Sequence, residues 1–301
     1  MTSPALSNEL SRADQWFGFR LTVPAAVILI ALLALPTGLT ILYSLHDVPA
    51  NGASLGPFVG FENFSIVLSS PVFWRSATVT LLFSVGFVTL STAIGLAMAI
   101  LLNQKFIGRG LARALLIIPW ATPWLVIGIL WKWFADGSVG GLNAVLIALG
   151  ITSDYHDFLA DPNTALPVTI LAAVWRQASF AGILLLAGLQ TLPDELGEAA
   201  ALDGAGVWQR FLHITLPWLR PALATVAVLN VIYAFLQFDV IFAMTQGGPG
   251  DATQVLSLLI YRQLFAVTQI GLGSALAVIL GLVALVGGLI TVKLLYRGHV
   301  Q

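Results

Sequence analysis

Six long stretches of this 301-residue sequence are almost free of charged residues. They cover residues 21–45, 77–102, 111–134, 166–192, 222–244 and 270–295. About 20 apolar residues cross the hydrocarbon core of a bilayer as a helix, so each stretch is long enough to span it. The short alternating segments that are typical of membrane barrels are absent. The sequence therefore predicts an all-α integral membrane protein with six transmembrane helices.

The composition excludes a water-soluble fold and several kinds of chemistry. Hydrophobic residues make up 58% of the chain and charged residues only 9%, against about 25% charged residues in soluble domains. The 13 Lys and Arg nearly balance the 14 Asp and Glu, so nucleic acid is not an expected partner. Cysteine is absent, which excludes disulfides and a catalytic thiol. The four histidines are dispersed without metal-ligand spacing, so no metal site is expected.

The distribution of basic residues predicts the orientation in the membrane. If both termini are cytoplasmic, nine basic residues lie in inner segments: Arg12, Arg20, Lys105, Arg109, Arg113, Arg210, Arg220, Lys293 and Arg297. Three lie in outer segments, namely Arg75, Lys132 and Arg262. Because basic residues concentrate in cytoplasmic loops, we expect cytoplasmic segments at 1–20, 193–217 and 297–301, and one transmembrane domain over 21–296. The first twenty residues lack a signal-peptide pattern, so the first span is expected to stay in a multi-pass protein of a bacterial inner (plasma) membrane.

The predicted cytoplasmic loop 193–217 contains a short helix. Pro193 suits a first-turn position, and Asp194 and Glu195 suit the positive end of the helix dipole. Gly204 supplies the left-handed residue with which many helices end. A helix of about ten residues is marginal alone in water. It is either a solvated connector or an element that docks on a partner.

The amino-acid sequence of this loop favours an element that docks on a partner. The pattern Glu198-Ala199-Ala200-x-x-Asp203-Gly204-Ala205, followed by Phe211, Ile214, Leu216 and Pro217, resembles the EAA loop of ATP-binding-cassette (ABC) importer permeases. Flanking segments resemble the carbohydrate-uptake branch, with its maltose-type and glycerol-phosphate-type members: Pro24 to Ser44, Gly60-Phe61-x-Asn63-Phe64, Phe73-Trp74, Gly108-Arg109, Pro119-Trp120-Ala121-x-Pro123 and Thr245-x-Gly247-Gly248-Pro249. The chain lacks the extra N-terminal spans and large external domain of the maltose permease. It looks like the shorter first permease of a trehalose or other disaccharide importer.

The resemblance implies a division of labour between subunits. A second, homologous permease would complete the path, two copies of a cytosolic ATPase would bind ATP and Mg, and an extracytoplasmic sugar-binding protein or lipoprotein would deliver the solute. Residues Glu198, Ala199, Ala200, Asp203, Gly204 and Ala205 would couple this chain to the ATPase. The chain itself is expected to be no enzyme and to bind no cofactor, because it lacks a GxxxxGK[ST] phosphate loop.

Polar residues inside the predicted spans are candidates for the substrate path. Asn230, Tyr233 and Gln237 are spaced by three and four, so they are expected on one helix face. They either bind sugar hydroxyls or hydrogen-bond between helices. Ionisable groups in spans usually face a bundle interior or a cavity. Arg176 and Asp239 could therefore line the path or form an ion pair with each other.

Three further features are expected to depart from a regular bundle of straight spanning helices. Pro119 and Pro123 should kink the third span. Residues 144–149 are apolar but too short to span, so they are expected to form an external or interfacial turn of helix. The Gly/Pro loop with Gly247, Gly248 and Pro249 is either a plain turn or, as the resemblance implies, a contact for the binding protein.

Three alternatives remain open from the sequence. A secondary sugar transporter often shows paired halves with broken helices, and no convincing internal repeat is present. An amino-acid or peptide permease of the same superfamily would keep the EAA loop but not the sugar-type flanks. A membrane enzyme would need a catalytic constellation, and none is found. The sequence does not identify the sugar.

Overall fold

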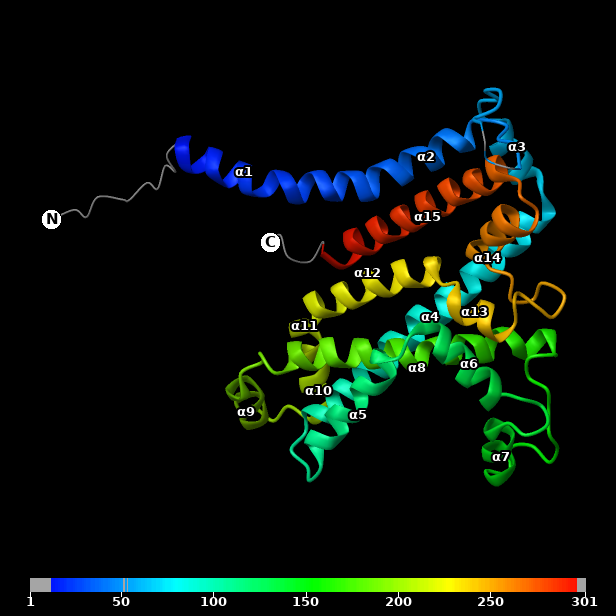
Figure 1. Cartoon of the computed structure of the whole chain (residues 1–301). Coiled ribbons are helices and arrows are strands. Elements are labelled where there is room, and N and C mark those ends of the chain that lie inside the picture. Colours follow the sequence, from blue (N-terminus) through cyan, green and yellow to red (C-terminus); the bar gives the residue numbers. More distant parts are fainter. Residues whose placement is uncertain (1–11, 51, 53, 297–301) are drawn as a thin grey trace.

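The computed structural model describes residues 12–50, 52 and 54–296, and these residues form an all-helical bundle (Figure 1). Predicted segment 297–301 and the first eleven residues of segment 1–20 lie outside this part of the chain. The helices, with π-helical segments labelled η, are α1 Arg12–Leu29, η1 Ile30–Ala34, α2 Leu35–Ser44, α3 Glu62–Ser69, α4 Pro71–Asn103, α5 Arg109–Ala121, α6 Trp124–Phe134, α7 Gly141–Ala148, α8 Pro162–Leu189, α9 Asp194–Leu202, α10 Val207–Arg210, η2 Phe211–Thr215, α11 Leu216–Trp218, α12 Arg220–Leu236, α13 Asp239–Met244, α14 Leu256–Tyr261, η3 Arg262–Ala266 and α15 Ile270–Tyr296.

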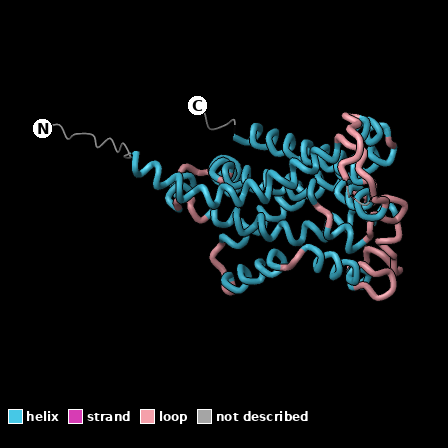
Figure 2. The backbone as a smooth tube through the Cα atoms, turned by 45° about the horizontal axis from the view of Figure 1, so that its top comes forward, coloured by secondary structure: helices cyan, strands magenta, loops and turns pink. Residues whose placement is uncertain are grey.

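The number of possible spans agrees with the predicted fold class. Four helical segments of the described chain are long and apolar enough to cross a membrane, and two pairs of bent helices raise the number to six. Figure 1 shows α9, the start of α1 and the end of α15 at one end of the bundle, and α3 and α7 at the other. We call these the α9 end and the α7 end. Figure 2 shows that most of the loop segments gather at one end, away from the start of α1.

Helix α8 lies at the centre of the packing. In its most apolar window 61% of the residues are buried, against 28% for α4 and 22% for α15. Its longest contact is with α4, and small residues form the closest part of that contact. A Cβ atom added at Gly95 of α4 would lie 2.6 Å from the Cβ atom of Ala181 in α8. Such close approach by small residues is typical of helix pairs in membranes.

The N-terminal rod is packed along only part of its length. Helices α1, η1 and α2 run on from one another (Figure 1), and α2 packs against α15. Within the described residues, helix α1 makes no extended contact with any helix other than η1. No residue from 19 to 29 of α1 is buried. The part of the chain that the structure describes therefore leaves α1 uncovered.

Two of the predicted spans are not single helices. The predicted span 111–134 is broken into α5 and α6, which meet at 100°. The predicted kink is confirmed, because Thr122 and Pro123 are extended there and Pro123 lacks a backbone donor. The predicted span 222–244 is wrong as one helix. Helix α12 ends at Leu236, Gln237 is extended, and α13 begins at Asp239.

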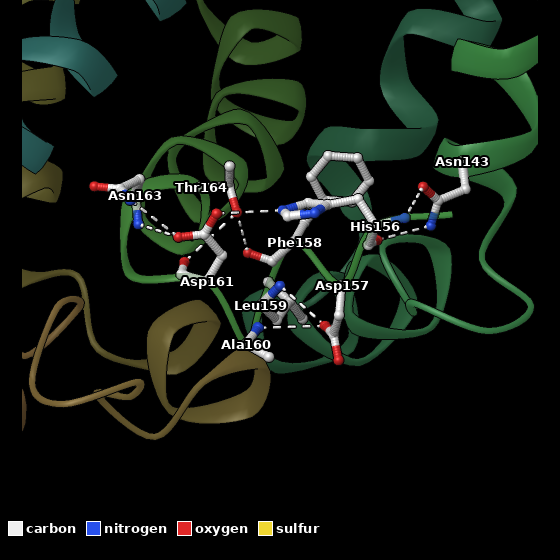
Figure 3. A network of polar contacts seen from close by, with 9 residues as sticks. All are labelled: Asn143, His156, Asp157, Phe158, Leu159, Ala160, Asp161, Asn163 and Thr164. Carbon is white, nitrogen blue, oxygen red and sulfur yellow. Dashed lines mark hydrogen bonds and ion pairs between the residues drawn. The ribbon is translucent and has the colours of Figure 1, made fainter. Parts of the chain in front are cut away.

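The α7 end carries a small polar subdomain that includes the predicted short helix at 144–149, observed as α7. The side chain of Asn143 is fully buried and donates to the carbonyl of Asp136 at 3.2 Å. It also donates to the carbonyl of His156 at 2.9 Å (Figure 3). The imidazole Nε2 of His156 lies 3.4 Å from a carboxylate oxygen of Asp161, which caps α8. Backbone N–H groups of Ser138 and Val139 lower the pKa of Asp136 by donating to its carboxylate.

Candidate functional site

The loop predicted to couple to an ATPase forms a short capped helix. Pro193 is the N-cap of α9, one position before the predicted first turn. Gly204 has a φ of +83°, so the predicted left-handed residue at the helix end is confirmed. The N–H of Ala205 donates to the carbonyl of Ala200 at 2.9 Å, and that of Gly204 donates to Ala201 at 3.1 Å. These two bonds make a Schellman motif, which ends the helix without help from other elements.

Helix α9 stands apart from the bundle. None of its residues is buried, and it has no extended contact with another helix in the described part of the chain. Arg210 of α10 donates to the carbonyl of Gly197 at 3.3 Å, which is the hydrogen bond that the structure shows between α9 and the next helix. Glu198, Ala199 and Asp203 are exposed. Leu202 is 90% exposed and Val207 77%. Exposed apolar side chains that lie close together are typical of surfaces that bind another protein.

The break between α5 and α6 brings three side chains together. The guanidinium Nε of Arg176 in α8 donates to the carbonyl of Thr122 at 2.9 Å, in the extended turn that separates the two helices. The Arg176 Cζ atom lies 4.0 Å from the ring centroid of Trp124, a cation–π contact. The Trp124 ring is in turn 6.4 Å from the ring of Tyr233. We call Arg176, Trp124 and Tyr233 the aromatic cluster.

The predicted polar stripe on the fifth span is split. Asn230 is fully buried, and its amide accepts from Gln177 of α8 at 2.7 Å and donates to Thr92 of α4 at 3.1 Å. It therefore has the interhelical role that the sequence left open. Tyr233 is 41% exposed on the same helix. Gln237 is beyond the helix end and buried. The predicted place of Gln237 on the same helix face as Asn230 and Tyr233 was wrong, because α12 stops at Leu236.

The remaining ionisable candidate lies elsewhere. Asp239 is the first acidic residue of α13, where the helix dipole favours a negative charge. The structure shows no ion pair between Asp239 and Arg176 among the described residues. That predicted pair is wrong, since Arg176 is held by Thr122 and Trp124. The contribution of Trp124 was not predicted, although Pro123 next to it was a signal that the helix breaks there.

The Gly/Pro loop is a tied turn at the α7 end. Arg262 pairs with Asp251 at 3.1 Å and donates to the carbonyl of Gln246 at 2.7 Å. Arg262 also contacts Gln254, and Arg75 of α4 contacts the carbonyl of Gly250. Gly247 has a φ of +92° and is buried, whereas Gly248 and Pro249 are half-buried. Two arginines thus hold the loop in one shape.

The described residues offer no group of three His, Cys, Asp or Glu side chains that could hold a metal ion.

The comparisons with known proteins agree with this geometry. Residues 91–297 match the family "binding-protein-dependent transport system inner membrane component". The chain is 38% identical to the trehalose/maltose transport system permease protein MalF of Thermococcus litoralis over 275 residues, 91% of this chain and 92% of that protein. It is 34% identical to the sulfoquinovosyl glycerol transport system permease protein SmoG of Agrobacterium fabrum, over 92% of this chain and 89% of that one.

A solved structure has the same fold. A bacterial ABC transporter involved in the import of the acidic polysaccharide alginate superposes with a TM-score of 0.80. It covers 94% of this chain and 96% of the matched chain, at 24% identity. The resemblance that the EAA loop indicated is confirmed, and the chain is a transporter subunit rather than an enzyme. It belongs to the family of multi-pass inner-membrane components of binding-protein-dependent transport systems.

Proposed function

We propose that this chain is one of two permease subunits of an ATP-driven importer that carries a sugar, a disaccharide such as trehalose or maltose, by alternating access. The name of the relative at 38% identity supports the disaccharide. The observation that carries the proposal is the free-standing α9 with its EAA sequence. Such a helix needs a partner surface, because nine residues are marginal alone in water.

The coupling partner is proposed to be a cytosolic ATPase in two copies. Its surface would receive Glu198, Ala199, Ala200, Asp203, Gly204 and Ala205, together with the exposed Leu202 and Val207. ATP and Mg would be bound by that ATPase.

The second permease would cover surfaces that this chain leaves open. Among the described residues, helix α1 has no extended contact except with η1, which follows it in the chain. The aromatic cluster is also partly exposed at Tyr233. A second subunit placed against both would close the path between the two permeases. The tied loop with Gly247, Gly248 and Pro249 would then meet the binding protein at the opposite end from the ATPase.

The aromatic cluster is the proposed sugar contact in this subunit. Tyr233 can stack on the apolar face of a pyranose, and Arg176 can donate to hydroxyls. The residues that line the path would be supported by Asn230, Gln237 and Asp239, since Asn230 and Gln237 are buried in this chain. Tyr233→Ala is expected to lower disaccharide uptake by up to about tenfold, because an aromatic contact contributes roughly 0.5–1.5 kcal/mol.

Uptake of labelled trehalose and maltose by cells that express the complete transporter measures this effect. Tyr155→Ala is the matched control, because Tyr155 is exposed in the α7-end loop. Equal uptake by wild type and Tyr233→Ala would place the sugar path elsewhere. If a non-sugar solute competes better than both disaccharides, the substrate class is wrong.

The orientation of the two ends is tested with thiols, because the chain has no native cysteine. Val207→Cys at the α9 end and Val139→Cys at the α7 end replace valines that are 77% and 68% exposed. An impermeant maleimide should label Val139→Cys in intact spheroplasts, and Val207→Cys only after the membrane is opened. The reverse pattern would separate α9 from any cytosolic ATPase and would refute the proposal.

A further inference from the structure

A basic pocket lies at the α9 end, where the spans α4, α5 and α8 meet α9. It has a volume of about 300 Å³, and its polar lining includes Lys105, Arg109, Arg113, Gln190 and Asp194. Three cations face one carboxylate there, so the pocket carries an excess of positive charge.

Two of these cations are free to take a ligand. The side chains of Lys105 and Arg109 have no hydrogen bond or ion pair within the described residues, although the backbone N–H of Arg109 donates to the carbonyl of Phe106 at 3.4 Å. Arg113 is already engaged in part. One Nη atom donates to the carbonyl of Leu102 at 2.9 Å, and both reach the side-chain oxygen of Gln190 at 3.1 and 3.2 Å when that oxygen is turned toward them. Its Nε is buried and has no hydrogen-bond partner among the residues that the structure describes. Arg113 thus fixes the floor of the pocket, and Lys105 and Arg109 form an open rim.

The start of α5 adds donors on the same rim. Gly108 is the N-cap with a φ of +88°, and no side chain caps the helix. A Cβ atom added at Gly110 would meet nothing within 4 Å. Uncapped N–H groups at a helix start attract anions, above all phosphate.

An apolar tip adjoins the basic rim. Phe106 and Ile107 lie between Lys105 and Gly108, and they are 41% and 103% exposed. Apolar side chains flanked by cations are typical of segments that lie in a membrane interface, with the apolar part among acyl chains and the cations at headgroups. An acidic peptide or free phosphate would leave this tip in water.

We propose that the pocket binds the phosphate of an anionic phospholipid headgroup. Lys105 and Arg109 contact the phosphate, and Phe106 and Ile107 lie among the acyl chains beside it. Asp194 and Gly197 of α9 line the same pocket, so the bound lipid also contacts the base of the coupling helix.

The test measures lipid binding to the full chain, purified in a neutral detergent, by native mass spectrometry. Phosphatidylglycerol is titrated, with phosphatidylcholine as the uncharged comparison. The wild type should prefer phosphatidylglycerol. Lys105→Gln/Arg109→Gln should weaken its binding about 25-fold, at roughly fivefold per basic side chain near a headgroup. Arg20→Gln/Arg220→Gln removes the same charge from exposed residues outside the pocket and should change binding less than twofold.

A second pair of variants separates a lipid from a soluble anion. Phe106→Ser/Ile107→Ser keeps every charge and should also weaken phosphatidylglycerol binding, whereas 10-fold excess inorganic phosphate should not displace the lipid. Displacement by phosphate, with no effect of the serine variant, would assign the pocket to a free anion and overturn the proposal. Equal losses in the two charge variants would overturn it as well. The proposal would also be overturned if Lys105→Gln/Arg109→Gln bound lipid normally but lost its association with the ATPase. That result would assign the pocket to an acidic protein surface.

Discussion

Glu198→Lys is expected to lower solute uptake by about 100-fold while leaving the protein inserted at its normal level. Glu198 is exposed on α9, and exposed substitutions usually change the free energy of unfolding by under about 0.5 kcal/mol. At the proposed interface between α9 and the ATPase, the positive charge of the new lysine would face ATPase groups that interact favourably with the carboxylate of Glu198. Truncating one partner of a desolvated charge pair costs roughly 2–5 kcal/mol, and about 2.7 kcal/mol corresponds to 100-fold.

The measurements are uptake in cells and co-purification of the ATPase. Glu62→Lys is the matched control, since Glu62 is an exposed glutamate in the first turn of α3, at the α7 end. It should leave both measurements unchanged. Normal uptake in Glu198→Lys, with the ATPase still bound, would show that α9 does not couple the two subunits.

Gly95→Val is expected to have the largest effect on folding. The added side chain would begin 2.6 Å from the Cβ atom of Ala181 and 3.0 Å from backbone atoms of Ala178 and Gly182. Helix α8 cannot retreat easily, because it is buried on several sides. Overpacking typically costs about 1–3 kcal/mol, and contact with backbone places this variant at the upper end.

Thermal unfolding in detergent should show a Tm lowered by roughly 6–12 °C for that cost. Gly281→Val is the control, because it makes the same change in α15 where nothing lies within 4 Å of the new Cβ atom. If the two variants unfold at the same temperature, the contact between α4 and α8 does not limit stability.

The positions of the long apolar helices were predictable from hydropathy along the sequence, whereas the breaks within the predicted spans 111–134 and 222–244 were only partly so. An uncharged run must be helical in a bilayer, whatever its neighbours are. The end of α9 was predictable for a similar reason. Glycine adopts the left-handed backbone conformation without steric cost, and Gly204 has this conformation at the helix end. The break at Pro123 was visible because proline removes a donor.

The rest of the site depends on tertiary contacts that no local pattern contains. The break after Leu236 involves no proline, and the Gln237 carbonyl there accepts from Ser257 at 2.5 Å, twenty residues away. Asn230 became an interhelical residue because Gln177 and Thr92 lie opposite it. Helix α14, which packs on α15 and α4, was not predicted because it is too short to span.

The isolation of α9 determines how motion can travel through this subunit. A helix of nine residues is about 13 Å long, and its internal hydrogen bonds make it stiff compared with the turns at its two ends. A push on α9 therefore displaces it as a rigid rod whose two ends pull on different parts of the chain. One end is joined to α8, the most buried of the long helices, by the short turn at residues 190–193. The other leads through α10 to the bent junction with α12. A small movement of α9 can thus shift α8 at the centre of the bundle and, at the same time, change the angle at the bent junction with α12.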